Sequence, residues 1–208
     1  MQSIRPIARV FALSALIALA GCDRGSGEEA QDGREGPSVG RNANGIDEPR
    51  GGWRDGAAIG EVSRDFVGSP LPALRFSDPD GDTLDLAGVD GPVLVNLWAT
   101  WCAPCVVEMP MLDTLAAQVD DVRVITISQD YRAAEVVAPF FETRDFEHLE
   151  PWLDPEAELT ARLSDNGQLP VSVLYDADGR EVFRVVGAYE WDSEEAVALV
   201  QEAVRDGT

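Results

Sequence analysis

The sequence PVLVNLWATWCAPC occupies residues 92–105 and joins an apolar run to two closely spaced cysteines. The near-continuous apolar run over 92–98 predicts a central strand that is covered on both faces. Residues 106–119 have helical spacing, so the cysteines lie at a strand-to-helix junction. Cys102 is therefore expected at the amino end of a helix, where unsatisfied amides and the helix dipole favour a thiolate.

The two cysteines are better explained by redox chemistry than by a structural role. In such a pair the attacking thiol is the more exposed and more acidic one, which by position is Cys102, and Cys105 resolves the mixed disulfide. Pro104 lies in the first turn, where a missing donor costs little, and it stiffens the small ring. A structural disulfide that closes so short a loop gains little entropy from the unfolded state. A four-cysteine zinc site would need a second pair, which the chain lacks.

The chain from about Gly60 onward has the pattern of a packed α/β domain. Apolar runs bounded by turn signals predict strands over 71–76, 83–86, 92–98, 122–128, 149–153, 171–175 and 181–186. Helical spacing predicts helices over 106–119, 131–143, 155–163 and 193–204, with Ser193 as the N-cap of the last. Asp- and Gly-rich turns at 78–82 and 176–179 predict two hairpins, the first of them near the start of the domain.

Residues 98–105 resemble the active-site segment of thioredoxin-fold proteins, and the chain over about 67–204 resembles the TlpA/ResA branch of membrane-tethered, periplasm-facing thiol-disulfide oxidoreductases. The resemblance implies an α/β, thioredoxin-like fold in which a central mixed β-sheet is flanked by helices and preceded by an N-terminal β-hairpin. Residues 131–153 correspond to the extra helix and strand that this branch inserts into the thioredoxin core.

Two prolines match further features of this family. Pro110, eight residues after Cys102, matches a proline that kinks the helix after the cysteines. Leu169-Pro170, just before a predicted strand, matches the cis-proline that faces the disulfide. The alternative for Pro170 is a trans proline that opens an edge strand.

Two polar positions refine the assignment. Ordinary thioredoxins have a buried aspartate where this chain has Asn96, which cannot relay a proton. Glu108, three residues after Cys105 and on the same helix face, matches an acidic residue of the TlpA/ResA branch. A partly buried carboxylate there would have a raised pKa and could accept or return the proton of the Cys105 thiol. The alternative is a solvated glutamate in a chain that is rich in acids.

The resemblance implies an enzyme that exchanges disulfides with exported proteins. In the reducing direction, Cys102 attacks a substrate disulfide held against Trp101, Leu169 and Pro170, and Cys105 then releases the substrate. The implied clients are apocytochrome c cysteines or the copper-site thiols of respiratory oxidases, and a membrane thiol-disulfide reductant returns the electrons. No cofactor or resident metal is expected, and no dimerisation segment is evident, so a monomer is expected. The direction of electron flow stays open, although Ala103-Pro104 favours a reductant.

Two alternatives remain beside this interpretation. A disulfide donor or isomerase would use the same cysteines, although an isomerase usually needs a dimer to present a cleft. A copper metallochaperone of thioredoxin fold would use two thiolates and a distal histidine. The spacing of Cys102 and Cys105 and the position of His148, the single histidine, count against the chaperone.

The first residues have the character of an export signal. Two arginines precede an apolar run over 10–20, which is about half the ~20 residues needed to span a bilayer. Residues 19–22, Leu-Ala-Gly-Cys, resemble the bacterial lipobox, in which the cysteine becomes the lipidated N-terminus. We therefore expect a signal peptide over 1–21, lipidation at Cys22, and a membrane-anchored lipoprotein that faces the periplasm. A plain signal peptide with an incidental cysteine is the alternative.

The remaining organisation follows from composition. Residues 22–60 are Gly-rich with little apolar periodicity, which predicts a flexible tether ahead of a domain over 61–208. The 208 residues carry 16 basic and 38 acidic side chains, a net charge of −22. This charge argues against nucleic acid and against docking on anionic lipid. Every basic residue is arginine, so Schiff-base and P-loop lysine chemistry is excluded.

Overall fold

The computed structural model describes residues 39–41, 47–49 and 60–206 of the chain. All described residues belong to one compact unit, which spans residues 35–208. The predicted signal peptide, the lipidation site Cys22 and most of the predicted tether lie outside the described residues. Within the tether, β1 (Val39–Arg41) and β2 (Asp47–Pro49) pair antiparallel as a separate two-stranded sheet. The composition of this stretch did not predict any strand there.

The main domain is built on one eight-stranded mixed sheet in the order β3-β10-β9-β6-β7-β8-β4-β5. Its strands are β3 (Glu61–Ser63), β4 (Arg75–Ser77), β5 (Thr83–Asp85), β6 (Val93–Trp98), β7 (Arg123–Ser128), β8 (Trp152–Leu153), β9 (Val171–Tyr175) and β10 (Glu181–Val186). The helices are α1 (Ala103–Ala116), α2 (Ala133–Glu142), α3 (Thr160–Leu163) and α4 (Glu194–Asp206), with a 3₁₀ turn, η1 (Leu86–Gly88).

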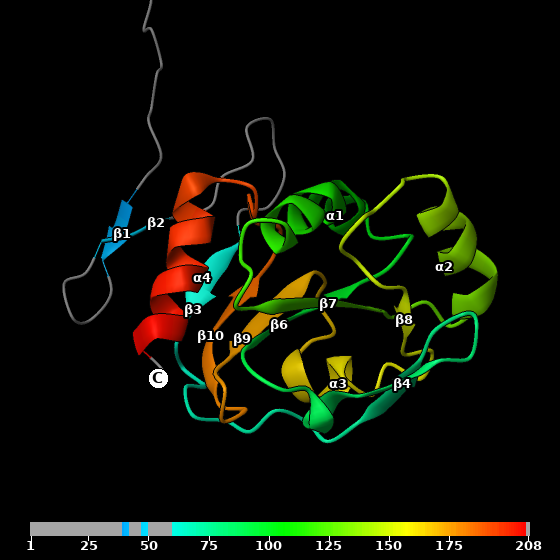
Figure 1. The fold of residues 1–208 in the computed structure, drawn as a ribbon, viewed down its shortest axis with the longest axis horizontal. Coiled ribbons are helices and arrows are strands. Elements are labelled where there is room, and N and C mark those ends of the chain that lie inside the picture. The colour runs from blue at the N-terminus through cyan, green and yellow to red at the C-terminus, as the bar shows by residue number, and fades with distance from the viewer. Residues whose placement is uncertain (1–38, 42–46, 50–59, 207–208) are drawn as a thin grey trace, which may run out of the picture. The chain divides into compact units, whose positions relative to one another are not determined.

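Both faces of the sheet are covered, as the long apolar run over 92–98 predicted. All six residues of β6 are buried, and the strand pairs parallel with β7 and antiparallel with β9. One face packs against α1, α2 and α4 through residues such as Leu112, Val137 and Val200. The other face packs against α3 and η1 through Leu163 and Leu86, and Figure 1 shows α1 and α3 on opposite sides of the sheet.

The insertion joins the N-terminal hairpin to the rest of the sheet. β4 and β5 form the predicted antiparallel hairpin. The hairpin is connected to the rest of the sheet through β8. Leu153 of β8 pairs with Ser77 of β4, and β8 pairs parallel with β7 on its other side. At the other edge β3, which the sequence analysis did not predict, pairs antiparallel with β10.

One predicted helix is much shorter than expected. The predicted helix over 155–163 is present only as the single turn α3, because Ala157 has a positive φ of 52° that interrupts a right-handed helix. The buried carboxylate of Asp154 accepts hydrogen bonds from the backbone N–H groups of Glu158 and Leu159 at 3.0 and 2.9 Å. These bonds stabilise a turn over 154–159 in place of the first helical turns.

Candidate active site

The two cysteines form a disulfide at the amino end of α1. The Sγ atoms of Cys102 and Cys105 are 2.01 Å apart, and their Cα atoms are 5.2 Å apart. Cys102 is the N-cap of the helix, as predicted, and its Sγ accepts a hydrogen bond from the Cys105 N–H at 3.4 Å. Cys102 is 6% exposed and Cys105 is fully buried, whereas the neighbouring Trp101 is 69% exposed. Of the two sulfurs, the one that a partner can approach therefore belongs to Cys102.

The predicted cis peptide lies at the same end of the sheet. The Leu169-Pro170 bond is cis, and the Pro170 carbonyl accepts a hydrogen bond from the Gly187 N–H at 2.9 Å. The next residue, Val171, pairs with Leu97 of β6, one residue before that strand ends and the cysteine loop begins. The register of β6 and β9 thus brings the predicted substrate-binding residues to the end of the sheet that carries the disulfide.

Glu108 is completely buried beneath the first turns of α1. Its Oε1 accepts a hydrogen bond from Asn96 Nδ2 at 2.8 Å, and its Oε2 accepts one from the Tyr189 N–H at 3.2 Å. Burial raises the pKa of Glu108 from 4.5 to about 8, and these two hydrogen bonds oppose the rise. The indole N–H of Trp191 is buried without a hydrogen-bond partner. The solvated alternative for the Glu108 side chain is therefore wrong.

Asn96 takes part in the site in a way that its sequence position did not reveal. Its Nδ2 donates to both Glu108 and Ser172, at 2.8 and 2.9 Å, while its Oδ1 is buried without a hydrogen-bond partner. Asn96 cannot relay a proton, but its hydrogen bond orients the Glu108 carboxyl group, for which the sequence predicted that role. A polar residue inside an otherwise apolar, fully buried strand was the signal in the sequence.

A second polar group was missed entirely. Asp130, just beyond β7, accepts hydrogen bonds from the backbone N–H and the hydroxyl of Thr100, both at 2.8 Å. Because β6 and β7 are parallel, their carboxyl ends meet at one edge of the sheet. The sequence could therefore have predicted that a polar residue soon after the strand over 122–128 lies near the cysteine loop.

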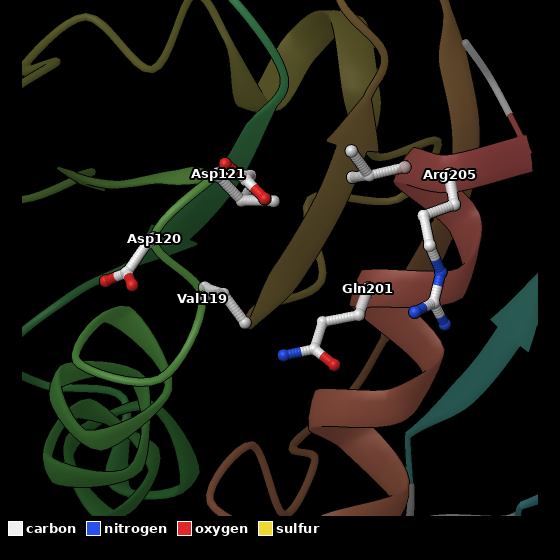
Figure 2. A pocket seen from close by; sticks show the side chains of 7 residues that line it. Val119, Asp120, Asp121, Gln201 and Arg205 are labelled. Atoms are coloured by element: carbon white, nitrogen blue, oxygen red, sulfur yellow. The ribbon is translucent and has the colours of Figure 1, made fainter.

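The remaining candidate features lie away from the disulfide. Figure 2 shows a small hollow lined by residues of the loop after α1 and of α4, among them Asp121 and Gln201, at the end of α1 opposite to Cys102. His148 is exposed, and its backbone N–H donates to Asp113. The described residues include no group of three or more His, Cys, Asp or Glu side chains that could hold a metal ion. Within the same part of the chain, no helix is long and apolar enough to cross a membrane.

Comparison with known proteins places this geometry in a family. The sequence profile of the Redoxin family matches residues 66–200, which include the disulfide, Glu108 and the cis-proline. The chain belongs to the Redoxin family. Among its relatives, the thiol-disulfide oxidoreductase ResA of Bacillus cereus is 29% identical over 122 residues, which cover 58% of this chain and 70% of ResA. A thioredoxin of Mycolicibacterium smegmatis is 33% identical over 110 residues, covering 52% of this chain and 77% of the thioredoxin.

Solved structures agree with this Redoxin assignment. The crystal structure of a thio-disulfide isomerase from Thermus thermophilus superposes with a TM-score of 0.55 at 30% identity, covering 65% of this chain and 95% of the isomerase. The predicted thioredoxin-like fold and the resemblance to ResA are thus confirmed. The chain is a thiol-disulfide oxidoreductase of the Redoxin family, with a cysteine pair at disulfide distance.

Proposed function

We propose that this Redoxin-family protein is an envelope reductant that transfers electrons from a membrane thiol-disulfide reductant to disulfides of exported proteins. The observation that carries the exchange chemistry is the buried Glu108, which lies one helical turn beyond Cys105 and has a pKa raised to about 8. A carboxyl group with this pKa can act both as a base and as an acid near neutral pH, as proton exchange with the Cys105 thiol requires. The reducing direction rests on Ala103-Pro104 between the cysteines and on the resemblance to the TlpA/ResA branch.

The reaction with a client proceeds in two displacements. The Cys102 thiolate attacks one sulfur of the client disulfide, and the client's other sulfur leaves as a thiolate. Glu108 then takes the proton from the Cys105 thiol, and the Cys105 thiolate attacks Cys102 Sγ. The Cys102–Cys105 disulfide forms and the second client sulfur leaves reduced. Two electrons have passed from the enzyme to the client.

Regeneration runs the same steps in reverse. A thiolate of the membrane reductant attacks Cys102 Sγ, and the Cys105 sulfur leaves. Protonated Glu108 supplies the proton that the Cys105 sulfur takes up. The second thiol of the reductant then attacks the reductant sulfur of the mixed disulfide, Cys102 leaves as a thiolate, and the reductant is left with the disulfide. Carboxylate is therefore needed for the reaction with the client, and carboxylic acid is needed for the reaction with the reductant.

The proposed clients are the cysteines of apocytochrome c or the copper-site thiols of respiratory oxidases. This part of the proposal rests on the resemblance of the chain to the TlpA/ResA branch. The cell-envelope location rests on the export-signal character of residues 1–21. The proposed surface for a client segment consists of the exposed Trp101 beside the disulfide and the half-buried Leu169, which precedes the buried Pro170.

The client is identified by trapping with Cys105→Ser. This variant keeps the attacking sulfur but lacks the resolving one, so mixed disulfides at Cys102 accumulate in cells. We expect mass spectrometry of the purified adducts to find apocytochrome c or a copper-site protein in the reducing direction. The matched control is Cys102→Ser, which should form no adduct with the same proteins. Adducts with many unrelated exported proteins would instead indicate a disulfide donor or isomerase.

The anchor is proposed at Cys22, by the lipobox resemblance of residues 19–22. We expect the protein extracted from membranes to begin at Cys22 and to carry the mass of a diacylglycerol and, depending on the host, an additional acyl chain. Replacement by alanine, Cys22→Ala, should move the protein from the membrane fraction to the soluble envelope fraction. An unmodified N-terminus downstream of residue 22 would refute the anchor.

A further inference from the structure

Asp130 is a buried carboxylate that binds the loop carrying the reactive cysteine. It lies two residues beyond the end of β7 and is 4% exposed. Its Oδ2 accepts hydrogen bonds from the Thr100 N–H at 2.8 Å and the Ser128 hydroxyl at 2.9 Å. Its Oδ1 accepts one from the Thr100 hydroxyl at 2.8 Å. Both oxygens of one carboxylate thus hold one residue, Thr100, through its backbone and its side chain.

The end of β7 holds this loop at a second point. The Gln129 N–H donates to the Trp98 carbonyl at 2.8 Å, at the end of β6. The strand-to-helix connection is therefore attached to β7 on both sides of Ala99. The Cys102 N–H donates to the Ala99 carbonyl at 3.1 Å, which closes a tight turn just before α1.

Two residues that a partner would contact, Trp101 and Cys102, follow directly after these contacts. Directly after Thr100, Trp101 is largely exposed, and Cys102 follows at the helix N-cap. The orientation of Trp101 and Cys102 depends on the backbone of Thr100, because Thr100 lies inside the turn that the Cys102 N–H and the Ala99 carbonyl close. Asp130 touches neither sulfur in any hydrogen bond that the structure shows, so its influence on the reaction passes through Thr100.

We propose that Asp130 is a positioning residue for thiol-disulfide exchange, which fixes Thr100 and thereby aims Trp101 and Cys102 at the client. The inference rests on the proposed role of Cys102 as the attacking sulfur. Exchange requires Cys102 Sγ and the two sulfurs of the client disulfide to lie in line. Misplacing the attacking sulfur by about 1 Å can slow such a step by up to about 10²-fold. Charge-assisted hydrogen bonds to a buried carboxylate supply the required rigidity.

The first test replaces the carboxylate by an amide in Asp130→Asn. The amide has one acceptor oxygen, so it cannot accept from the N–H and the hydroxyl of Thr100 in the present geometry. With insulin as the disulfide substrate and dithiothreitol as the electron source, kcat/KM should fall about tenfold or more. The pH dependence should keep its wild-type inflection, because Glu108 is untouched.

The matched control is Asp154→Asn. Asp154 is also a buried carboxylate just beyond a strand, at 3% exposure. It accepts two backbone N–H bonds, whereas Asp130 accepts one backbone N–H bond and two hydroxyl bonds. The partners of Asp154 belong to the loop before α3 and not to the cysteine loop. We expect Asp154→Asn to lose about as much stability as Asp130→Asn. Its rate of insulin reduction should stay within about twofold of wild type.

A second pair of variants covers the case in which Asp130→Asn fails to fold. Thr100→Ser keeps the hydroxyl donor to Asp130 and should retain wild-type kcat/KM. In Thr100→Val the side chain has the same shape but lacks the hydroxyl donor, so kcat/KM should fall several-fold. Equal activity of the two Thr100 variants, or of Asp130→Asn and Asp154→Asn, would overturn the inference, as would a shifted pH inflection in Asp130→Asn. Insulin reduction by Cys102→Ser would overturn the proposed attacking role instead.

Discussion

Glu108→Gln is expected to slow thiol-disulfide exchange by about 10²-fold or more, because general acid–base catalysis by a positioned side chain contributes about 10²- to 10⁴-fold. Glutamine keeps the size of the side chain and can accept the Asn96 hydrogen bond, so the fold should survive. What it cannot do is exchange a proton with Cys105. The measurement is the single-turnover rate of the reduced protein with a disulfide client.

The rates of the two half-reactions should depend on pH in opposite directions. In the reaction with a client the carboxylate is the active form, so the rate should rise as the pH increases through about 8. In regeneration by a dithiol the carboxylic acid is active, so the Glu108 contribution should be lost above about pH 8. Both inflections should vanish in Glu108→Gln. The control is Glu202→Gln, which removes the same charge from an exposed position of α4. If Glu108→Gln retains the wild-type pH profiles, the proton-transfer role is wrong.

The same pKa has a consequence for stability. Because the folded pKa of Glu108, about 8, lies above its ordinary value of 4.5, the native state binds the proton more tightly than the unfolded state. The associated stability is fully present below about pH 4.5 and is lost as the pH rises to about 8. Urea unfolding of the oxidised proteins should therefore show Glu108→Gln gaining stability relative to wild type between pH 5 and pH 8.

The second large effect concerns a buried ion pair. Glu181→Ala is expected to lower the free energy of unfolding by about 3–5 kcal/mol, because it leaves a buried guanidinium without its counter-charge. The Oε1 and Oε2 atoms of Glu181 accept hydrogen bonds from Nε and Nη2 of Arg184 at 2.6 and 2.7 Å. The Nη1 of Arg184 donates to the Leu163 carbonyl at 2.7 Å, and the guanidinium lies 3.8 Å from the centre of the Phe66 ring. Urea unfolding measures the loss.

An exposed pair provides the contrast. Arg75 and Asp85 lie 2.9 Å apart with side chains 75% and 45% exposed. Solvent screens this pair, so Asp85→Ala should cost less than about 1 kcal/mol. The double replacement Glu181→Leu with Arg184→Met should recover much of the loss seen in Glu181→Ala, because it removes both charges. The expectation fails if Glu181→Ala costs no more than Asp85→Ala.

The sequence predicted those parts of the fold that depend on neighbours along the chain. Hydrophobic runs located strands such as 92–98 and 122–128, and the turn at 176–179 located the hairpin of β9 and β10. The helix over 155–163 was predicted too long, because the side chain of Asp154 competes for the backbone N–H groups of the first turn. β3 was missed, because it pairs with the distant β10 and no adjacent hairpin turn marks it, as the turn at 78–82 marks the equally short β4 and β5.

What the sequence by itself determined is the reactive pair, its place at a helix N-terminus and the order of the elements, since spacing and turn chemistry are local. Only the tertiary structure decided which polar groups meet. Asn96 reaches Glu108 from a strand, Tyr189 reaches it from the loop after β10, and Asp130 reaches Thr100 from the end of β7. The strand register, and with it the burial of Glu108, arises from packing between segments distant along the chain. Its raised pKa is a property of that packing, because burial raises the cost of charge and no local pattern specifies burial.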